Sequence, residues 1–358
     1  MKKKAVVGMS GGVDSSVAAY LLKEQGYEVI GVTMQIWQAD DTAGAREGGC
    51  CGLSAIDDAR RVAAQLDIPY YVMNFRQDFQ KHVIDYFVSE YRSGRTPNPC
   101  IACNRYVKWE ALLQRSLSIG ADYIATGHYA QIARLPDGRY AVRQSAAVKK
   151  DQTYALYSLT QEQLRHTLFP AGAYTKEQIR QIAAQAGLKV AAKPDSQEIC
   201  FVTDNDYAGF ISRETGRAEQ PGCFVSADGT VLGQHKGISH YTVGQRKGLG
   251  LAFGKPVFVT QIKAAANEVV LGPHEDLMTV HLQAQQVCYM ARERLEPGQR
   301  MMAKIRYSHA GEDCTVTEVS ADGSSICLQF DRPVRAVTPG QAVVFYEDGY
   351  VLGGGTIV

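Results

Sequence analysis

The chain has 358 residues, which is enough for two or three domains that each bury a core. Apolar residues make up 45% of it and charged residues 21%, an ordinary globular composition that excludes collagen-like, low-complexity and wholly disordered chains. The 38 Lys and Arg residues outnumber the 37 Asp and Glu residues by only one. Because the chain is no global polycation, it would have to bind nucleic acid through local basic patches.

The sequence carries no pattern of a secretion signal or a membrane span. Lys2, Lys3 and Lys4 resemble the start of a signal peptide, but Ser10 and Asp14 interrupt the apolar stretch that would have to follow. No run approaches the ~20 apolar residues that cross a bilayer. We therefore expect a cytoplasmic protein with no membrane partner, whose nine cysteines are thiols, metal ligands or catalytic groups and not structural disulfides.

Strand and helix patterns alternate over the first two hundred residues. Short apolar runs predict strands at 5–9, 28–34, 69–73 and 123–126. Helical spacing predicts helices at 13–23, 55–66 and 79–91, and a further one begins at Thr175, where Gln178 completes a capping box. This alternation predicts an α/β domain over residues 1–204, with a parallel sheet covered on both faces.

The pattern changes beyond about residue 200. Helical periodicity fades, and short alternating runs at 257–262, 314–319, 326–330 and 343–346 are separated by turn signals such as Asp322-Gly323 and Pro339-Gly340. We expect two small β-rich modules, a central one over 205–277 and a C-terminal β-barrel over 278–358.

The sharpest chemical signal is the segment Ser-Gly-Gly-Val-Asp-Ser-Ser at residues 10–16, between a predicted strand and a predicted helix. Two glycines let the backbone approach an anion closely, and the amides that follow point at it from a helix N-terminus. Asp14 would repel a phosphate unless Mg²⁺ lay between them. The Gly-Lys-Ser/Thr ending of an ordinary P-loop is absent. A tight turn with an Asp cap is the structural alternative.

A second signal is formed by three cysteines. Cys100 and Cys103 form a C-x-x-C pair within Thr-Pro-Asn-Pro-Cys-Ile-Ala-Cys-Asn (96–104), and Cys200 lies in Asp-Ser-Gln-Glu-Ile-Cys-Phe (195–201). Pro97 and Pro99 predict a stiff loop without a helix, as suits a thiol held in fixed geometry. The alternative is a partial metal site, although no second C-x-x-C at zinc spacing is present.

These segments carry a resemblance to a known family. The loop at 10–15 resembles that of the PP-loop ATP pyrophosphatase superfamily, whose members cleave ATP between the α and β phosphates and adenylate a substrate oxygen. With the cysteine segments, the chain resembles the tRNA-specific 2-thiouridylase family nearly end to end. Further matching segments are Gly-His-Tyr (127–129), Lys-Asp-Gln-Thr-Tyr (150–154), His-Tyr-Thr-Val-Gly-Gln-Arg-Lys-Gly-Leu-Gly (240–250), Ala-Val-Thr-Pro-Gly-Gln (336–341) and Leu-Gly-Gly-Gly (352–355).

The resemblance implies an enzyme, a sulfurtransferase that uses ATP and Mg²⁺ to adenylate the C2 oxygen of the wobble uridine of tRNA and then replaces that oxygen with sulfur. It implies that Cys103 is the nucleophile and that Cys200 carries a persulfide, and Asp14 and Cys100 are the other two expected catalytic residues. The implied partners are tRNA with a wobble uridine and a sulfur-donor protein or sulfide source. The implied nucleotide site comprises Gly8, Met9, Ser10, Gly11, Gly12, Val13, Asp14, Ser15, Met34 and Gly127. The implied tRNA contacts are Asn98, Pro99, Cys100, His128, Lys150, Asp151, Gln152, Arg306, Tyr307 and Gln341.

One position departs from a common family pattern. Many members carry Asp where this chain has Cys100. Together with Cys103 and Cys200, this third thiol could ligate a [4Fe–4S] cluster with one open iron that binds sulfide. A Cys103 bound to a cluster could not act as a free nucleophile, so the cluster and the Cys200 persulfide are alternative sulfur carriers.

RNA binding has support that is independent of the resemblance. Residues 229–267 contain no acidic side chain but five Lys and Arg residues, and arginines and lysines at 292–306 add to this charge. Two other functions stay open. One is a different PP-loop adenylating ligase, similar to GMP synthetase, and the other is a noncatalytic RNA-binding protein that senses ATP.

Overall fold

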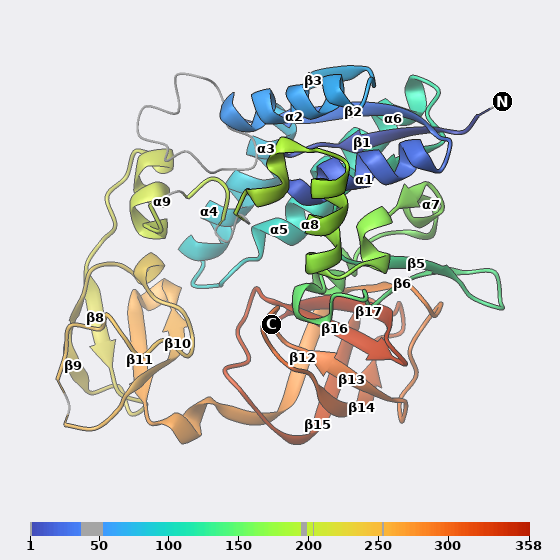
Figure 1. Cartoon of the computed structure of the whole chain (residues 1–358). Coiled ribbons are helices and arrows are strands. Elements are labelled where there is room, and N and C mark those ends of the chain that lie inside the picture. The colour runs from blue at the N-terminus through green and yellow to red at the C-terminus, as the bar shows by residue number, and fades with distance from the viewer. Residues whose placement is uncertain (1, 37–52, 195–198, 203, 253) are drawn as a thin grey trace. The chain divides into compact units, whose positions relative to one another are not determined.

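The computed structural model describes residues 2–36, 53–194, 199–202, 204–252 and 254–358 (Figure 1). The chain divides into two compact units. The first comprises Met1–Val83, Cys100–Thr203 and Asp348–Leu352, and the second comprises Ile84–Pro99, Asp204–Glu347 and Gly353–Val358. Each unit is therefore assembled from segments that are far apart in the sequence.

The first unit is built on a parallel sheet of five strands in the order β3-β2-β1-β4-β7. These strands are β1 (Lys4–Gly8), β2 (Glu28–Gln35), β3 (Tyr70–Asn74), β4 (Tyr123–Ala125) and β7 (Thr167–Leu168). Strand β1 lies at the centre, where Gly8 pairs with Val32 of β2 and Val7 pairs with Ala125 of β4. The loop that follows β1 therefore emerges at the carboxyl edge of the sheet, where open α/β sheets bind ligands.

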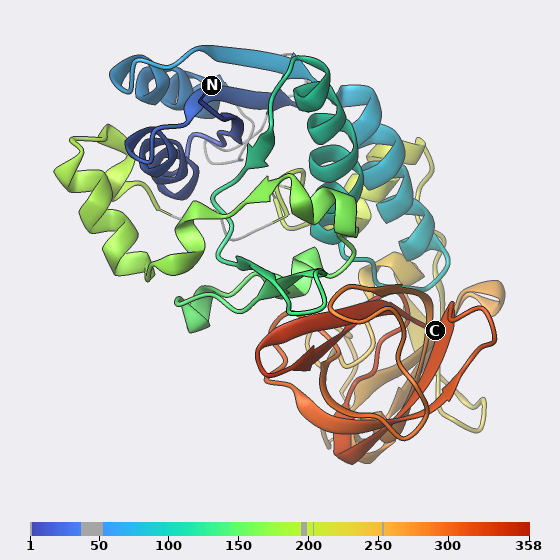
Figure 2. The ribbon, with the colours of Figure 1, turned by 90° about the vertical axis from the view of Figure 1, so that its right-hand side faces the viewer.

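Helices cover both faces of this sheet, as the sequence predicts. Helices α1 (Val13–Glu24), α2 (Leu53–Gln65) and α8 (Lys176–Gln185) bury Val17, Val62 and Ile179 in one core with Val7. In Figure 2 the dark-blue α1 and the yellow-green α8 lie on one side of the sheet, and the teal helix α6 (Leu113–Ser118) lies on the other. The expected α/β class with a parallel sheet is confirmed.

The capping box predicted at the start of α8 is present. Thr175 accepts a hydrogen bond at Oγ1 from the backbone N–H of Gln178 at 3.3 Å, and the Gln178 side chain accepts one from the N–H of Thr175 at 2.8 Å. This pairing satisfies two backbone donors that the first turn would otherwise leave unpaired. It fixes the position of Lys176, the first residue of the helix.

The helix predicted over 79–91 is confirmed, and it contains a π segment that the prediction lacks. The chain forms three successive helical segments, namely α3 (Arg76–Phe79), a π-helix η2 (Gln80–Ile84) and α4 (Asp85–Arg92). A π turn admits an extra residue and so rotates the apolar face, which a 3.6-residue period cannot reveal. Helix α4 belongs to the second unit. The other elements of the first unit are α5 (Pro99–Ala102), the π-helix η3 (Cys103–Leu112), β5 (Gln131–Arg134), β6 (Tyr140–Arg143), α7 (Gln161–Arg165) and the 3₁₀ helices η4 (Val148–Lys150), η5 (Thr153–Leu156), η6 (Pro170–Ala173) and η7 (Lys189–Ala192).

The second unit contains a four-stranded sheet in the order β10-β11-β8-β9. Its strands are β8 (Gly222–Val225), β9 (Val231–His235), β10 (Phe258–Lys263) and β11 (Glu268–Gly272). Phe224, Tyr241, Val259 and Leu271 form its core. The helix α9 (Tyr207–Thr215) precedes this sheet, and two 3₁₀ helices, η8 (Ile238–His240) and η9 (Ala264–Ala266), interrupt it.

The second unit also contains a closed antiparallel barrel of six strands. Its order is β12-β15-β14-β13-β16-β17, and the pairing of β12 with β17 closes it. The strands are β12 (Met278–Tyr289), β13 (Arg300–Lys304), β14 (Glu312–Val319), β15 (Ser325–Arg335), β16 (Ala342–Glu347) and β17 (Tyr350–Ile357), and η10 (His274–Leu277) leads into them. The expected C-terminal β-barrel is confirmed. Among the helices in the described ranges, none has the length and apolarity needed to cross a bilayer.

Candidate active site

The loop between β1 and α1 leads into a helix whose N-cap residue has no side chain to cap it. Gly12 is the N-cap residue and offers no side-chain oxygen to the first-turn amides. Ser15 instead turns back into the loop, where its Oγ accepts a hydrogen bond from the N–H of Ser10 at 3.1 Å and lies 3.3 Å from Ser10 Oγ. Such a terminus attracts anions because its amide dipoles point outward. The loop therefore has the geometry of the predicted phosphate site.

Close backbone packing explains two glycines of this loop and its surroundings. Gly11 has a φ of +69°, and a Cβ there would lie 2.3 Å from the carbonyl oxygen of Ala55. A Cβ at Gly127 would lie 2.5 Å from the backbone N of Ser15 and 2.6 Å from the carbonyl carbon of Asp14. The structure therefore brings Gly127, predicted for the nucleotide site, against the first turn of α1, and no larger residue fits at either position.

Asp14 takes part in a polar cluster that sequence reasoning missed. Lys176 Nζ donates to both carboxylate oxygens of Asp14, at 2.8 and 2.9 Å, and Tyr129 OH donates to Oδ1 at 2.6 Å. Lys176 is 9% exposed and its Nζ lies 5.8 Å from the centre of the Tyr129 ring. The negative charge of Asp14 is thus compensated by a cation of the chain itself, and this cluster stands where the sequence analysis expected Mg²⁺.

A second lysine holds the opposite end of the loop. Lys193 Nζ donates to the carbonyl oxygen of Gly11 at 3.1 Å and to Asp58 Oδ2 at 2.7 Å. Lys193 follows η7, and Asp58 lies on α2. Neither lysine has a local sequence signal, because each reaches the loop from more than 160 residues away. The capping residue Thr175, which directly precedes Lys176, is the one local feature that could have drawn attention to that lysine.

The cysteine segment is helical, so the expected loop without a helix is wrong. Pro99 begins the short helix α5, where a missing N–H costs nothing, and Cys103 begins the π-helix η3. Their spacing of three residues places the thiols of Cys100 and Cys103 on one helical face. Cys100 is exposed and Cys103 is half-buried. The helix thus presents the C-x-x-C pair at its first turn.

Cys200 belongs to a short turn that an aromatic contact anchors. The N–H of Val202 donates to the carbonyl oxygen of Ile199 at 3.0 Å, and Cys200 lies half-buried between them. The buried Phe201 ring packs edge-on against Phe79 of α3, with ring centres 5.8 Å apart. The preceding residues 195–198 of the motif, like Cys50 and Cys51, lie outside the described residues.

The two expected metal sites, Mg²⁺ beside Asp14 and a [4Fe–4S] cluster on three cysteines, stay predictions. Within the described ranges, no group of three or more His, Cys, Asp or Glu residues is arranged to hold a metal ion. Cys100, Cys103 and Cys200 therefore do not form the ligand set of an iron–sulfur cluster in this conformation. Asp14 is the expected partner of Mg²⁺, but it is occupied by Lys176 and Tyr129.

Comparison with known proteins identifies the family. Three family models together match nearly the whole chain: a tRNA methyl transferase HUP domain over 3–204, a tRNA methyl transferase PRC-barrel domain over 209–273 and an aminomethyltransferase beta-barrel domain over 279–357. The tRNA-specific 2-thiouridylase MnmA of Lachnoclostridium phytofermentans is 65% identical over 99% of both chains. That of Clostridioides difficile (strain 630) is 54% identical over 100% of this chain and 98% of its own. The chain belongs to the tRNA-specific 2-thiouridylase family. A 4-thiouridine synthetase–RNA complex with bound ATP aligns with a TM-score of only 0.34 at 19% identity, over 57% of this chain and 46% of its own, a likeness too slight to support an inference.

Two residues that the family resemblance assigns to tRNA form hydrogen bonds within their own loop in this chain. The carboxylate of Asp151 accepts hydrogen bonds from the N–H of Ser145 at 2.9 Å and of Thr153 at 3.2 Å. Gln152 and Tyr129 exchange two bonds, since Tyr129 N–H donates to Gln152 Oε1 and Gln152 N–H donates to Tyr129 O, both at 2.9 Å. Gln152 thereby supports the residue that contacts Asp14. Lys150, at the end of η4, is half-buried.

His128, which is also assigned to tRNA, lies among aromatic rings. Its ring centre is 5.6 Å from that of Trp109 and 5.9 Å from that of Phe169, and its Nδ1 lies 2.6 Å from Thr126 Oγ1. Burial lowers the pKa of His128 well below its ordinary value, and the positive charge of Lys108 lowers it further. The imidazole is therefore neutral at physiological pH and cannot attract a phosphate by charge.

The remaining residues assigned to the site lie where their elements place them. Met34 is half-buried near the carboxyl end of β2 and pairs with Met73 of β3. In the second unit, Tyr307 is 47% exposed, whereas the guanidinium of Arg306 donates to the carbonyl oxygen of Arg335 at 2.9 Å. Asn98 and Gln341 also belong to the second unit, with Pro99 at its boundary.

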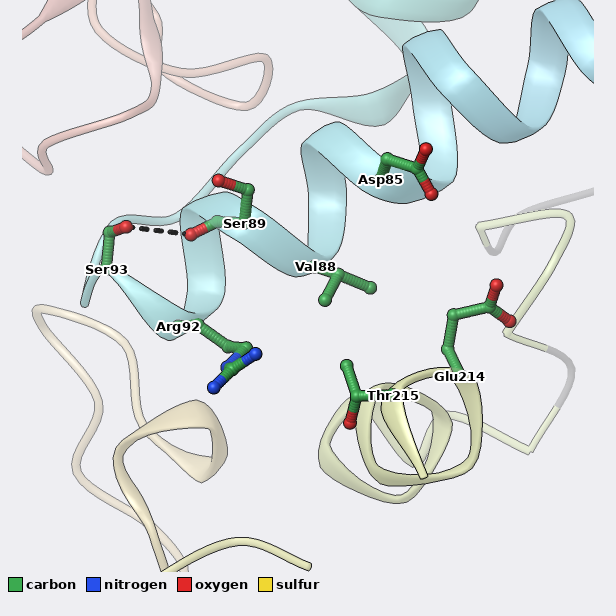
Figure 3. Close-up of a pocket in the computed structure, with 7 residues that line it drawn as sticks. All are labelled: Asp85, Val88, Ser89, Arg92, Ser93, Glu214 and Thr215. Atoms are coloured by element: carbon green, nitrogen blue, oxygen red, sulfur yellow. Dashed lines mark hydrogen bonds between the residues drawn. The ribbon is translucent and has the colours of Figure 1, made fainter. Parts of the chain in front are cut away.

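A hollow of about 380 Å³ in the second unit contains none of the predicted residues. It lies between α4 and α9, as Figure 3 shows, and its lining mixes acidic, basic and hydroxyl side chains. Ser93 Oγ at its rim donates to the carbonyl oxygen of Ser89 at 2.8 Å. With Asp85 and Glu214 beside the single cation Arg92, this hollow has no preference for a polyanion such as RNA.

Proposed function

We propose that this protein catalyses the ATP-dependent 2-thiolation of the wobble uridine of tRNA. The observation that carries the proposal is that the sequence similarity extends over the full length of the chain. Relatives named tRNA-specific 2-thiouridylase are 54–65% identical over essentially the whole of both chains. The uncapped N-terminus of α1 supports ATP as the cosubstrate. The products would be 2-thiouridine in tRNA, AMP and pyrophosphate.

The first step is adenylation of the uracil. The C2 oxygen attacks the α-phosphorus of ATP, the bond to the bridging oxygen breaks, and pyrophosphate leaves with that electron pair. The amides of the first turn of α1 would bind the phosphates, while Lys176 and Lys193 offset the carboxylates of Asp14 and Asp58 beside the loop. Any Mg²⁺ would enter with ATP as part of the substrate.

The second step transfers sulfur to the activated carbon. A donor protein passes a sulfane sulfur to Cys200, and the terminal sulfur of this persulfide attacks C2 as AMP leaves, taking up the persulfide proton. The Cys103 thiolate then attacks Cys200 Sγ, and the electron pair of the broken S–S bond stays on the sulfur attached to C2. A Cys103–Cys200 disulfide remains, which a cellular thiol must reduce before the next turnover.

The experiment uses the whole protein, ATP, a persulfide donor and an unmodified tRNA transcript with a wobble uridine. We expect 2-thiouridine in the digested product by mass spectrometry, with one AMP formed for each. Cys103→Ser and Cys200→Ser should abolish 2-thiouridine, whereas Cys327→Ser on β15, a half-buried strand cysteine, should leave it unchanged.

The two alternatives predict other outcomes of the same assay. A ligase similar to GMP synthetase would form AMP only with a purine nucleotide and an ammonia source, and it would not require Cys103. A noncatalytic ATP sensor would bind tRNA and ATP but form no AMP. Either outcome would refute the thiolation proposal.

A further inference from the structure

The segment that leads into the cysteine helix is held by the rim of the barrel. Pro339, between β15 and β16, accepts a hydrogen bond at its carbonyl oxygen from the N–H of Thr96 at 2.9 Å. The side-chain amide of Gln341 donates from Nε2 to the carbonyl oxygens of Thr96, at 2.9 Å, and of Pro97, at 3.3 Å. Residues 339–341 therefore bind the backbone N–H and carbonyl oxygen of Thr96 and the carbonyl oxygen of Pro97.

The partners on the barrel are themselves fixed. The N–H of Gln341 donates to Thr338 O at 3.1 Å, and its carbonyl oxygen accepts from the N–H of Ile357 at 2.8 Å. Gly340 has a φ of +89°, and a Cβ there would lie 2.9 Å from Arg95 Cβ. The amide of Gln341 thus extends from an anchored backbone, and Gly340 allows the close approach.

The start of the held segment is fixed as well. Arg95 Nε donates to Glu90 Oε2 at 2.8 Å, and Glu90 is only 9% exposed. The N–H of Arg95 donates to the carbonyl oxygen of Glu90 at 2.9 Å where α4 ends. A rigid base therefore precedes the contact with Gln341.

Two prolines limit the backbone hydrogen bonds that the held segment can form. Pro97 and Pro99 have no N–H, so the backbone can form no regular ladder there, and both prolines are buried. The Gln341 amide supplies donors to two successive carbonyl oxygens in this stretch. After Asn98 and Pro99 the chain continues directly into α5, which carries Cys100 and leads to Cys103.

We propose that Gln341 is a positioning residue for sulfur transfer: its side-chain amide fixes the Thr96–Pro97 backbone and so sets the start of the helix that carries Cys100 and Cys103. This rests on the proposed function only for the identity of the reaction. It differs from the direct contact with tRNA that the family resemblance implies, because the amide nitrogen is directed at the protein backbone.

The test compares Gln341→Glu, which is isosteric and lacks the N–H donors when ionised, and Gln341→Met, which is apolar and of similar length. Gln329→Met, an exposed residue of β15, is the matched control. The first readout needs neither tRNA nor activity, namely the rates at which iodoacetamide alkylates Cys100 and Cys103, followed by peptide mass spectrometry. We expect both Gln341 variants to change these rates about threefold or more and the control to leave them unchanged.

The second readout separates positioning from tRNA binding. We expect the turnover number for 2-thiouridine to fall about 10- to 100-fold in both Gln341 variants, with the Kd for tRNA within about twofold of the wild type. A Kd weakened about tenfold with unaltered alkylation rates would instead establish a direct tRNA contact and overturn the proposal. Should Gln341→Glu not fold, Gln341→Met and hydrogen exchange of peptide 93–99, expected to accelerate, decide the question. If the wild type proves to have no thiolation activity, the alkylation and exchange measurements still test the positioning role.

Discussion

Lys176 Nζ lies 2.8 and 2.9 Å from the two carboxylate oxygens of Asp14, and this ion pair joins the first residue of α8 to the first turn of α1. The lysine side chain is 10% exposed and the carboxylate 31%. The pair is thus partly shielded from solvent, and Lys176 keeps the carboxylate of Asp14 from repelling an incoming phosphate.

We predict that Lys176→Met lowers AMP formation about 100-fold, because the Asp14 carboxylate then loses its cation beside the loop where negative charge develops during adenylation. Lys176→Arg should recover part of this loss, since it keeps the charge but alters the geometry. Lys189→Met, an exposed lysine near the same helix, is the matched control and should retain full activity. The measurement is single-turnover AMP formation with saturating tRNA. Equal rates for Lys176→Met and Lys189→Met would contradict the assigned role.

Gly127 gives a second prediction, which concerns shape alone. Gly127→Ala places a methyl group 2.5 Å from Ser15 N, so the first turn of α1 must move. We expect ATP affinity to fall about 10-fold or more and unfolding free energy to fall by about 1–3 kcal/mol. The comparison is Gly120→Ala, where no atom lies within 4 Å and a φ of +79° imposes only a backbone cost of about 1 kcal/mol. Calorimetric ATP titration and urea unfolding measure both, and unchanged ATP binding in Gly127→Ala would refute the steric argument.

The contacts of Asp14 show which parts of the site the sequence predicts and which it does not. The loop, its flanking strand and helix, and the capping box at Thr175 follow from local patterns, because each depends on residues within a few positions of one another. Lys176 and Lys193 do not, since their partners Asp14 and Gly11 are brought close only by the packing of α8 and η7 against α1 and α2.

The family resemblance assigns Asp151 and Gln152 to tRNA, but both side chains form hydrogen bonds within the protein. Asp151 and Gln152 carry the polarity expected of RNA-binding residues, yet their side chains bind Ser145, Thr153 and Tyr129 within the protein. A polar residue near a site can bind the ligand directly, or it can position a second residue that binds the ligand. The same residue types serve both purposes. Only the direction of the side chain separates the two, and no sequence period encodes it.

The arrangement of the cysteines predicts the metal content. Because Cys100, Cys103 and Cys200 do not form a metal-binding group within the described residues, we expect protein purified without oxygen to contain far fewer than the about four irons per chain of a [4Fe–4S] cluster. Chelation followed by removal of the chelator should then leave thiolation with a persulfide donor unchanged. Iron, acid-labile sulfide and the visible spectrum are the measurements, with Cys100→Ala beside the wild type. About four irons per chain that disappear in Cys100→Ala would instead establish the cluster and overturn the persulfide route.

Three desolvated imidazoles predict how the free energy of unfolding depends on pH. Burial lowers the pKa of His128, of His235 and of His309 from the ordinary 6.5, with Lys108 and Arg306 lowering those of His128 and His309 further. Below 6.5 the unfolded chain therefore binds protons that the folded chain does not, so the free energy of unfolding falls as pH drops, by at most about 1.4 kcal/mol per pH unit for each imidazole.

The test is urea unfolding at about pH 7.5, 6.5 and 5.5, a window that lies above the titration of most carboxylates. The wild type should lose little stability between pH 7.5 and 6.5 and more between 6.5 and 5.5. His128→Phe should be less sensitive to pH over the same range, because its ring cannot be protonated in the unfolded state, whatever its stability at pH 7.5. His166→Phe, which alters a partly exposed imidazole paired with Glu162, is the comparison. If the slope of unfolding free energy against pH is the same for His128→Phe and the wild type, the lowered pKa of His128 is contradicted.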